Sequence, residues 1–203
     1  EVADRRKSPR DDLISAMIEV EELGDQLTDE EIIGTSILTL NAGHEATVHA
    51  IGNALLALAG RPDQYRALRS GVPVSSAVDE LLRFDSPLQM FERWVLEDTE
   101  VSGQRLSRGS KVGLLFGSAN HDQGVFGDSA EEVVLTRDPN PHVSFGAGVH
   151  YCVGAPLAKV ELEATLATFA RRIGSFELLR TENRIESLVF RGVGTLELEL
   201  TPV

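Results

Sequence analysis

The feature that most constrains the fold is an apolar run of about thirty residues with clear signals at both ends. At its start, "TDEE" places Thr28 three residues before Glu31, the arrangement of a capping box in which each side chain satisfies a backbone amide of the other residue. At its end, "GRP" places Gly60 just before Pro62, and both residue types terminate helices. At about 1.5 Å per residue, the predicted helix is about 45 Å long and crosses a whole domain. Because it is apolar on most sides, we expect it to be buried in the middle of the protein.

The remaining patterns predict a mainly helical chain with a minor antiparallel β-sheet. Helical spacing is present at residues 13–18, 63–69 and 75–84 and again after residue 155. Residues 89–120 alternate in polarity and contain the turn pairs Ser102-Gly103 and Arg108-Gly109, which predict short strands. Residues 121–142 are polar and predict an ordered meander with little regular structure. The final segments "SFELL" and "GTLELEL" are typical of strands.

Charge and cysteine content limit the function classes. The 203 residues are 42% hydrophobic and carry a formal net charge of -13, so the chain can bury one core but repels phosphate backbones and anionic lipid. We therefore expect neither nucleic acid nor a membrane as a partner. Polar residues interrupt the long apolar run, which argues against a transmembrane helix. One cysteine and the charged opening "EVADRRKSPRDD", which lacks the apolar core of a secretory leader, predict a cytoplasmic protein.

The single cysteine, Cys152, lies in a glycine-rich loop that leads into a predicted helix. Amides at a helix entrance carry partial positive charge, so they favour a thiolate and can donate to its sulfur. An anionic sulfur with amide donors is a good ligand for iron. A lone cysteine is more often an inert small hydrophobe, and the spacing by itself leaves both interpretations open. The glycines that would let the backbone approach a flat ligand closely are Gly146, Gly148 and Gly154.

Three segments, in order along the chain, resemble the cytochrome P450 family. "FGAGVHYCVG", residues 145–154, matches the FxxGxxxCxG pattern of its haem-binding loop, and the helix "APLAKVELE" that follows is also similar. "ELLR", residues 80–83, resembles its ExxR motif, and "AGHEAT", residues 42–47, resembles the distal motif of its long central helix. The resemblance is closest to soluble bacterial members. It implies the C-terminal part of the P450 fold, with residues 1–203 as the C-terminal portion of a single haem-thiolate domain whose N-terminal half is absent.

The resemblance also implies roles for individual residues around a haem b group. Cys152 matches the proximal axial thiolate ligand of the haem iron, and Phe145 matches the residue that packs beside the sulfur and shields it. His150 and Arg93 match positions that bind the haem propionates, where a cation meets a carboxylate. For His142, a propionate contact and an ordinary surface histidine are both open.

Glu80 and Arg83 match a buried ion pair that supports the haem loop from behind, which is a structural role. In the family a third arginine, from the meander, completes this network. Here the stretch "FGDSAEEVVLTRD" has Glu131 and Glu132 in the region where related sequences often show an arginine close to an aromatic residue. The sequence therefore does not identify the third arginine. Without the family, an ExxR pair would be an ordinary surface pair on a helix.

The distal motif departs from the family pattern. Members usually follow the acidic residue directly with a threonine that helps to deliver protons to iron-bound oxygen, whereas here Glu45 is followed by Ala46, and Thr47 comes one place later. A shift of one residue turns a helical side chain by about 100°, so Thr47 does not simply substitute. Ordered water, a substrate hydroxyl or Glu45 in a rearranged network remain as proton routes, as does weak oxygen activation or other haem-thiolate chemistry.

The implied function is a haem-thiolate monooxygenase that inserts one oxygen atom from O2 into a small organic substrate. Electrons would come from NAD(P)H through a ferredoxin with its reductase, or through a flavoprotein. The partner would approach the thiolate side, where Lys159, Arg171 and Arg172 supply positive charge; an ordinary solvated helix face explains them equally well. Leu88, Met90 and Phe91 indicate a partly apolar substrate pocket and no more.

Two rival interpretations remain. "HEATVH" nearly spells the zinc motif HExxH, but His44 and His49 are five residues apart and differ by about 140° around a helix, so they do not face one metal. The second rival is a truncated fragment that binds haem without catalysis or is inert, because much apolar surface would lack its complement.

Overall fold

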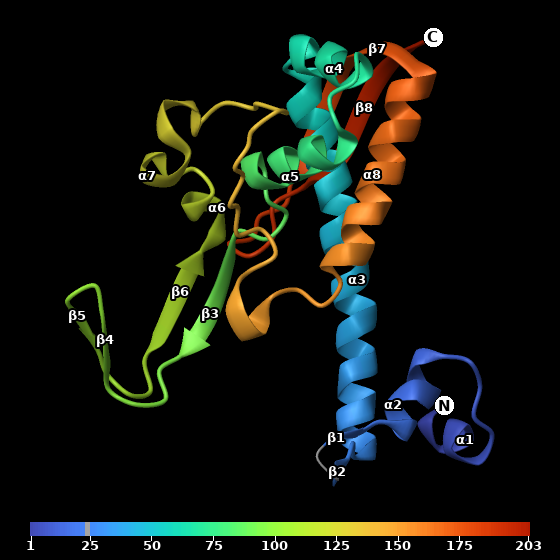
Figure 1. Ribbon diagram of the computed structural model, residues 1–203, viewed down its shortest axis with the longest axis vertical. Coiled ribbons are helices and arrows are strands. Elements are labelled where there is room, and N and C mark those ends of the chain that lie inside the picture. Colours follow the sequence, from blue (N-terminus) through green and yellow to red (C-terminus); the bar gives the residue numbers. More distant parts are fainter. Residues whose placement is uncertain (23–24) are drawn as a thin grey trace. The chain divides into compact units, whose positions relative to one another are not determined.

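The computed structural model describes residues 1–22 and 25–203 and divides them into two compact units, residues 1–45 and 46–203. Helices and small antiparallel hairpins make up both units, which confirms the predicted fold class (Figure 1). The elements of the first unit, and the helix that continues into the second, are α1 (Val2–Lys7), α2 (Leu13–Glu19), β1 (Glu21–Glu22), β2 (Asp25–Gln26) and α3 (Asp29–Ala59).

The first unit has a small core of its own. Val2, Met17 and Ile32 are its buried residues, and three half-buried aliphatic side chains pack against them. Asp12 caps α2 by accepting a hydrogen bond from the Ser15 amide at 2.9 Å. It also pairs with Arg5, which ties α1 to the start of α2.

Helix α3 has the bounds that the sequence predicts. The Thr28 amide donates to the Glu31 carboxylate at 2.8 Å, and the Glu31 amide donates back to the Thr28 hydroxyl at 3.2 Å, so the capping box is present. The helix then runs to Ala59, where Gly60 and Pro62 end it. Its 31 residues span about 46 Å.

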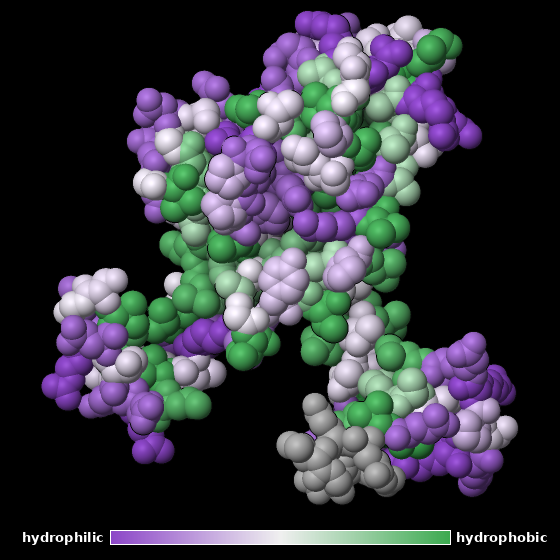
Figure 2. Space-filling view, in the orientation of Figure 1, coloured by the Kyte–Doolittle hydropathy of each residue, from purple (hydrophilic) through white to green (hydrophobic). Residues whose placement is uncertain are grey.

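The expected burial of α3 on most sides is wrong for its first half. Ile37, Leu38 and Leu40 are 57%, 67% and 75% exposed, and apolar surface is visible along the middle of the helix in Figure 2. The helix is buried further on, where Ala50, Ala54 and Leu58 enter the core of the second unit. The reason is that hydrophobic periodicity reports which faces can be buried, whereas burial itself requires another element that packs there.

The core of the second unit lies between helices and one hairpin. Tyr65 packs edge to face against Phe169 and Phe176, with ring centroids 6.0 and 4.8 Å away, and its hydroxyl donates to the Ile173 carbonyl at 2.8 Å. Leu81 and Leu166 join this cluster from two helices. The elements concerned are α4 (Pro62–Arg69), α5 (Val74–Phe84), α8 (Ala155–Arg172), β7 (Ile173–Arg184) and β8 (Val193–Pro202).

Two further hairpins replace the single small sheet that residues 89–120 predict. In the first, Arg93 lies opposite Val112. The second turns at Ser102 and Gly103, whose φ values of 50° and 79° suit a tight turn. The strands are β3 (Met90–Trp94), β4 (Thr99–Val101), β5 (Gln104–Leu106) and β6 (Lys111–Leu115). The predicted meander follows and contains, after α6 (Phe116–Ala119), the short helix α7 (Gln123–Phe126) and one 3₁₀ turn.

Candidate functional site

The cysteine loop, residues 145–154, closes on itself before α8 begins. The Cys152 amide donates to the Phe145 carbonyl at 2.9 Å, and the Cys152 carbonyl accepts from Ala155 at 3.2 Å. Gly146 and Gly148 have φ values of 73° and 64°, a conformation that residues with a side chain rarely adopt. These glycines therefore permit the tight path that returns the chain to the entrance of α8.

The Cys152 thiol is exposed at this entrance. Gly154 is the N-cap of α8, and a Cβ atom added to it would lie 3.9 Å from the Cys152 sulfur. Among the described residues, the amides of Val153 and Gly154 have no hydrogen-bond acceptor. Unpartnered amides at a helix N-terminus favour an anionic sulfur. An accessible thiol beside such donors fits the donor set that a haem-thiolate centre needs.

The other residues predicted near the haem lie in three different settings. Phe145 is half-buried, with its ring 6.2 Å from Tyr151 and 5.9 Å from the Lys159 ammonium. His150 is exposed at the end of a 3₁₀ turn. Arg93 is half-buried in β3 and donates to the neighbouring Glu92 carbonyl at 2.9 Å. Their roles toward a haem group stay predictions.

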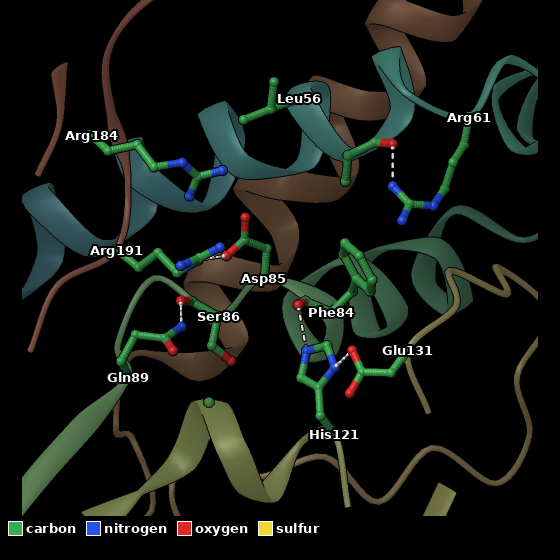
Figure 3. A pocket seen from close by; sticks show the side chains of 12 residues that line it. Leu56, Arg61, Phe84, Asp85, Ser86, Gln89, His121, Glu131, Arg184 and Arg191 are labelled. Carbon is green, nitrogen blue, oxygen red and sulfur yellow. Dashed lines mark hydrogen bonds and ion pairs between the residues drawn. The ribbon is translucent and has the colours of Figure 1, made fainter. Parts of the chain in front are cut away.

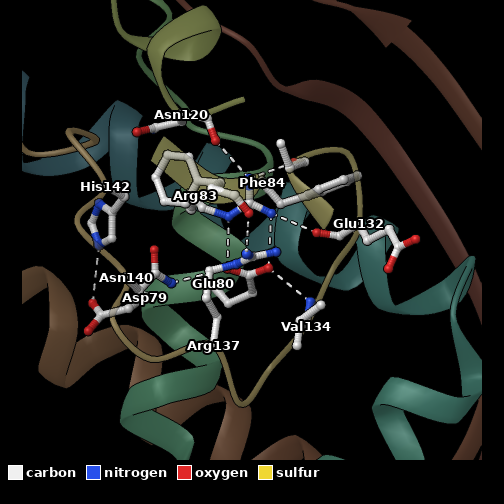
Figure 4. A network of polar contacts seen from close by, with 12 residues as sticks. Asp79, Glu80, Arg83, Phe84, Asn120, Glu132, Val134, Arg137, Asn140 and His142 are labelled. Carbon is white, nitrogen blue, oxygen red and sulfur yellow. Dashed lines mark hydrogen bonds and ion pairs between the residues drawn. The ribbon is translucent and has the colours of Figure 1, made fainter. Parts of the chain in front are cut away.

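Glu80 and Arg83 form a fully buried ion pair on α5 (Figure 4). Both side chains are 0% exposed, and two parallel hydrogen bonds of 2.8 and 2.9 Å join the guanidinium to the carboxylate. Arg83 also donates to three backbone carbonyls, at distances of 2.6 to 2.8 Å, which belong to Asn120, Ala130 and Glu132. Full pairing of both groups offsets the cost of burying them, and it fixes the meander to α5.

The third arginine of this network, which sequence reasoning missed, is Arg137. Its Nε donates to the Glu80 carboxylate at 3.0 Å, and the guanidinium lies 5.7 Å from the Phe126 ring. Glu131 and Glu132 do not displace it, because both side chains are exposed and Glu132 contributes only its carbonyl. The aromatic residue that signals such an arginine is close in space but eleven positions upstream, so a search of adjacent residues does not find it.

Asn120 connects this network to the cysteine loop. Its amide group donates to the hydroxyls of Ser86 and Ser144, both at 2.9 Å, and its Oδ1 accepts from the Val143 amide at 2.8 Å. Ser144 in turn donates to the Leu82 carbonyl at 2.9 Å. The two residues before Phe145 are thus held against α5. No motif in the sequence pointed to Asn120.

His142 is not a surface histidine, since its side chain is 7% exposed. Its Nε2 lies 3.4 Å from the Asp79 carboxylate, and the Lys159 ammonium contacts the same carboxylate at 2.7 Å. Asp79 therefore joins α5, the approach to the cysteine loop and α8. Burial by itself raises the pKa of Asp79, but hydrogen bonds from His142 and Lys159 outweigh it and hold the pKa below its ordinary value of 3.8.

This pKa predicts how stability depends on pH. A carboxyl group with a lowered folded-state pKa contributes stability above its unfolded pKa and loses it as pH falls through the folded value. We therefore expect Asp79→Asn to be less stable than wild type at neutral pH and the difference to shrink below pH 3.8, as measured by urea denaturation across pH. Asp128→Asn, at an exposed aspartate in no ion pair among the described residues, is the control. A difference for Asp79→Asn that is constant with pH would contradict this interpretation.

The distal-motif residues lie within α3. Glu45, the last residue of the first unit, is exposed, and Ala46 and Thr47, which open the second unit, are half-buried. The helix is continuous across them, so Thr47 is turned by about 100° from the position that Ala46 occupies. The described residues contain no group of three or more His, Cys, Asp or Glu side chains that could hold a metal ion, which leaves the zinc alternative without support.

Comparison with known proteins decides the family. The family model described as "Cytochrome P450" matches residues 1–73 and 74–188. The chain belongs to the cytochrome P450 family. This P450 chain is 39% identical over 200 residues to "Biotin biosynthesis cytochrome P450" of Bacillus subtilis (strain 168), a match that covers 98% of the chain and 49% of the relative. It is 34% identical over 197 residues to "Steroid C26-monooxygenase" of Rhodococcus jostii (strain RHA1), with 97% and 41% covered.

Solved structures agree with the sequence relatives. The structure of cytochrome P450 CYP109Q5 from Chondromyces apiculatus superimposes with a TM-score of 0.92 at 35% identity and covers 100% of this chain and 53% of that one. The fold is therefore part of the P450 fold, as predicted, and the chain spans about half the length of the curated relatives it matches. Within the described residues, no helix has both the length and the hydrophobicity needed to cross a bilayer.

Proposed function

We propose that this chain is the C-terminal portion of a single haem-thiolate domain whose activity is monooxygenation, with Cys152 as the axial ligand of haem b. The observation that carries the proposal is the exposed Cys152 thiol at the entrance of α8, beside two amides that lack acceptors among the described residues. Family membership supports it, as does the relative that is named a steroid monooxygenase. Bound haem supplies the site at which O2 is activated, so that one oxygen atom enters a small organic substrate.

The residues of the chain hold and shield this group. Phe145 packs beside the loop and limits access of water to the sulfur, while Gly146, Gly148 and Gly154 keep the backbone low enough for a flat ligand to approach. His150 and Arg93 bind the propionate carboxylates by charge-assisted hydrogen bonds. The buried network of Glu80, Arg83 and Arg137 positions the loop and takes no part in the chemistry.

Proton delivery takes a modified route. A side chain at position 46 offers no proton in this chain, because the residue is alanine. The exposed carboxylate of Glu45 and the half-buried hydroxyl of Thr47 are the neighbouring groups that can hold a proton or a water molecule. Glu45→Gln separates these two roles, because it removes the carboxylate and leaves the hydroxyl.

Electrons are proposed to come from NAD(P)H through a ferredoxin and its reductase, or through a flavoprotein. Arg171 and Arg172 are exposed in the last turn of α8 and carry the positive charge for docking. Lys159 contributes less than its sequence position indicates, since its ammonium is paired with Asp79 at 2.7 Å. The reducing cytoplasm, where a single free thiol persists, is the proposed location.

The second candidate is a haem-binding or inert fragment without catalysis. The observation that favours it is the exposure of Ile37, Leu38 and Leu40 on α3, which are 57% to 75% exposed. Partial coverage of the relatives favours it as well.

One experiment distinguishes the two candidates. The chain is supplied with haem, NADPH, a ferredoxin, ferredoxin reductase and isotopically labelled O2, with a fatty acid and a steroid as probes, and products are analysed by mass spectrometry. Monooxygenation predicts a product that carries one labelled oxygen atom and is absent with Cys152→Ala. Haem uptake without labelled product would support the second candidate.

A further inference from the structure

A cavity of about 390 Å³ lies in the second unit, at the end of α5 and beside the last turns of α3 (Figure 3). No residue of the cysteine loop lines it. Its volume falls within the range of sites for small molecules, about 300–1,000 Å³. Leu56 and Phe84 form an apolar wall, and the remaining lining is largely polar or charged.

The cavity holds more positive than negative charge that is not already paired. Arg191 is paired with Asp85 at 2.5 Å, and the Glu131 carboxylate contacts the His121 ring at 3.0 Å, so both acidic groups have partners. Arg61 and Arg184 line the same space, and neither has a carboxylate partner among the described residues. Two uncompensated guanidinium groups in a chain of net charge -13 make this cavity a local site of positive potential.

The arrangement of these arginines suits a ligand between them. In Figure 3, Arg184 and Arg191 enter from one side and Arg61 from the other. Arg61 uses one donor on the Ala57 carbonyl at 3.1 Å and lies 4.4 Å from the Phe84 ring centroid, which fixes its guanidinium against the apolar wall. A guanidinium has five donors, so Arg61 and Arg184 both keep donors for an oxyanion.

We propose that this cavity binds a small organic anion, with a carboxylate or phosphate group between Arg61 and Arg184 and an apolar body against Leu56 and Phe84. Guanidinium groups recognise both oxyanions through charge-assisted hydrogen bonds. The paired Asp85 and Glu131 exclude cations from competing for the site less strongly than free acids would attract them. The site is independent of haem, so its test does not depend on the proposed monooxygenase activity.

The test uses isothermal titration calorimetry of the chain at low salt with phenyl phosphate, benzoate and the neutral analogue benzamide. We expect phenyl phosphate or benzoate to bind and benzamide not to bind; the stronger of the two anions identifies the oxyanion. Arg184→Gln should weaken binding about tenfold, because it removes a charge-assisted contact. Arg184 is exposed, so the variant should fold, which circular dichroism checks.

The matched control is Arg66→Gln, which removes the same charge from an exposed arginine of α4 that does not line the cavity. It should bind the anion as wild type does. Absence of binding by both anions, equal binding of benzamide, or equal weakening in Arg66→Gln and Arg184→Gln would overturn the proposal.

Discussion

Replacement of Arg83 by methionine is expected to lower the free energy of unfolding by about 3–5 kcal/mol, the cost of breaking a buried ion pair from one side. The substitution leaves the Glu80 carboxylate, which is 0% exposed, without its bidentate partner. It also removes the donors that satisfy the carbonyls of Asn120, Ala130 and Glu132. Because typical domains are stable by about 5–15 kcal/mol, a large share of the molecules would unfold.

Urea denaturation followed by circular dichroism measures this effect. Arg66→Met, at an exposed position on α4, removes the same charge with the same side chain and should change stability by less than about 0.5 kcal/mol. Arg83→Lys keeps the charge but loses the paired geometry, so it should fall between wild type and Arg83→Met. Equal stability of Arg83→Met and Arg66→Met would show that the network is not what holds the meander to α5.

Replacement of Asn120 by alanine should have the second largest effect, a loss of about 2–3 kcal/mol. The buried Val143 amide would lose its acceptor, and the hydroxyls of Ser86 and Ser144 would lose a shared donor. The effect should be local as well as global, because Ser144 directly precedes Phe145 in the cysteine loop. Hydrogen exchange read by mass spectrometry should therefore show faster exchange in a peptide that covers residues 143–154.

The control for this variant is Gln123→Ala. Gln123 is an exposed residue in α7, three positions along the chain from Asn120. Its removal should leave both the stability and the exchange of the cysteine loop unchanged. Unaltered exchange of the loop in Asn120→Ala would mean that Asn120 does not anchor it.

Local chemistry explains which parts of the fold the sequence could predict. The capping box of Thr28 and Glu31 and the terminator Pro62 act on the residues beside them, and α3 begins and ends where they predict. The pairing of Glu80 with Arg83 depends on a spacing of three residues within one helix, and the structure contains it. The tight path at Gly146 and Gly148 likewise follows from the freedom of glycine.

Contacts between distant segments could not be predicted in the same way. Arg137 meets Glu80 across 57 positions, and His142 meets Asp79 across 63, so no local pattern records either contact. The exposure of Leu38 and Leu40 is a similar case, because the apolar pattern of α3 does not specify what packs against it. Long-range polar contacts and the extent of burial are therefore the properties that required the structure.

The central claim is that Cys152 ligates haem iron as a thiolate, and the absorption spectrum of the purified chain with haem, reduced and exposed to carbon monoxide, tests it most directly. The account predicts a Soret band at the red-shifted position typical of thiolate ligation in wild type. The same spectrum with Cys152→Ala should lack that band. Failure of the wild-type chain to take up haem, or a spectrum that the substitution leaves unchanged, would contradict the account.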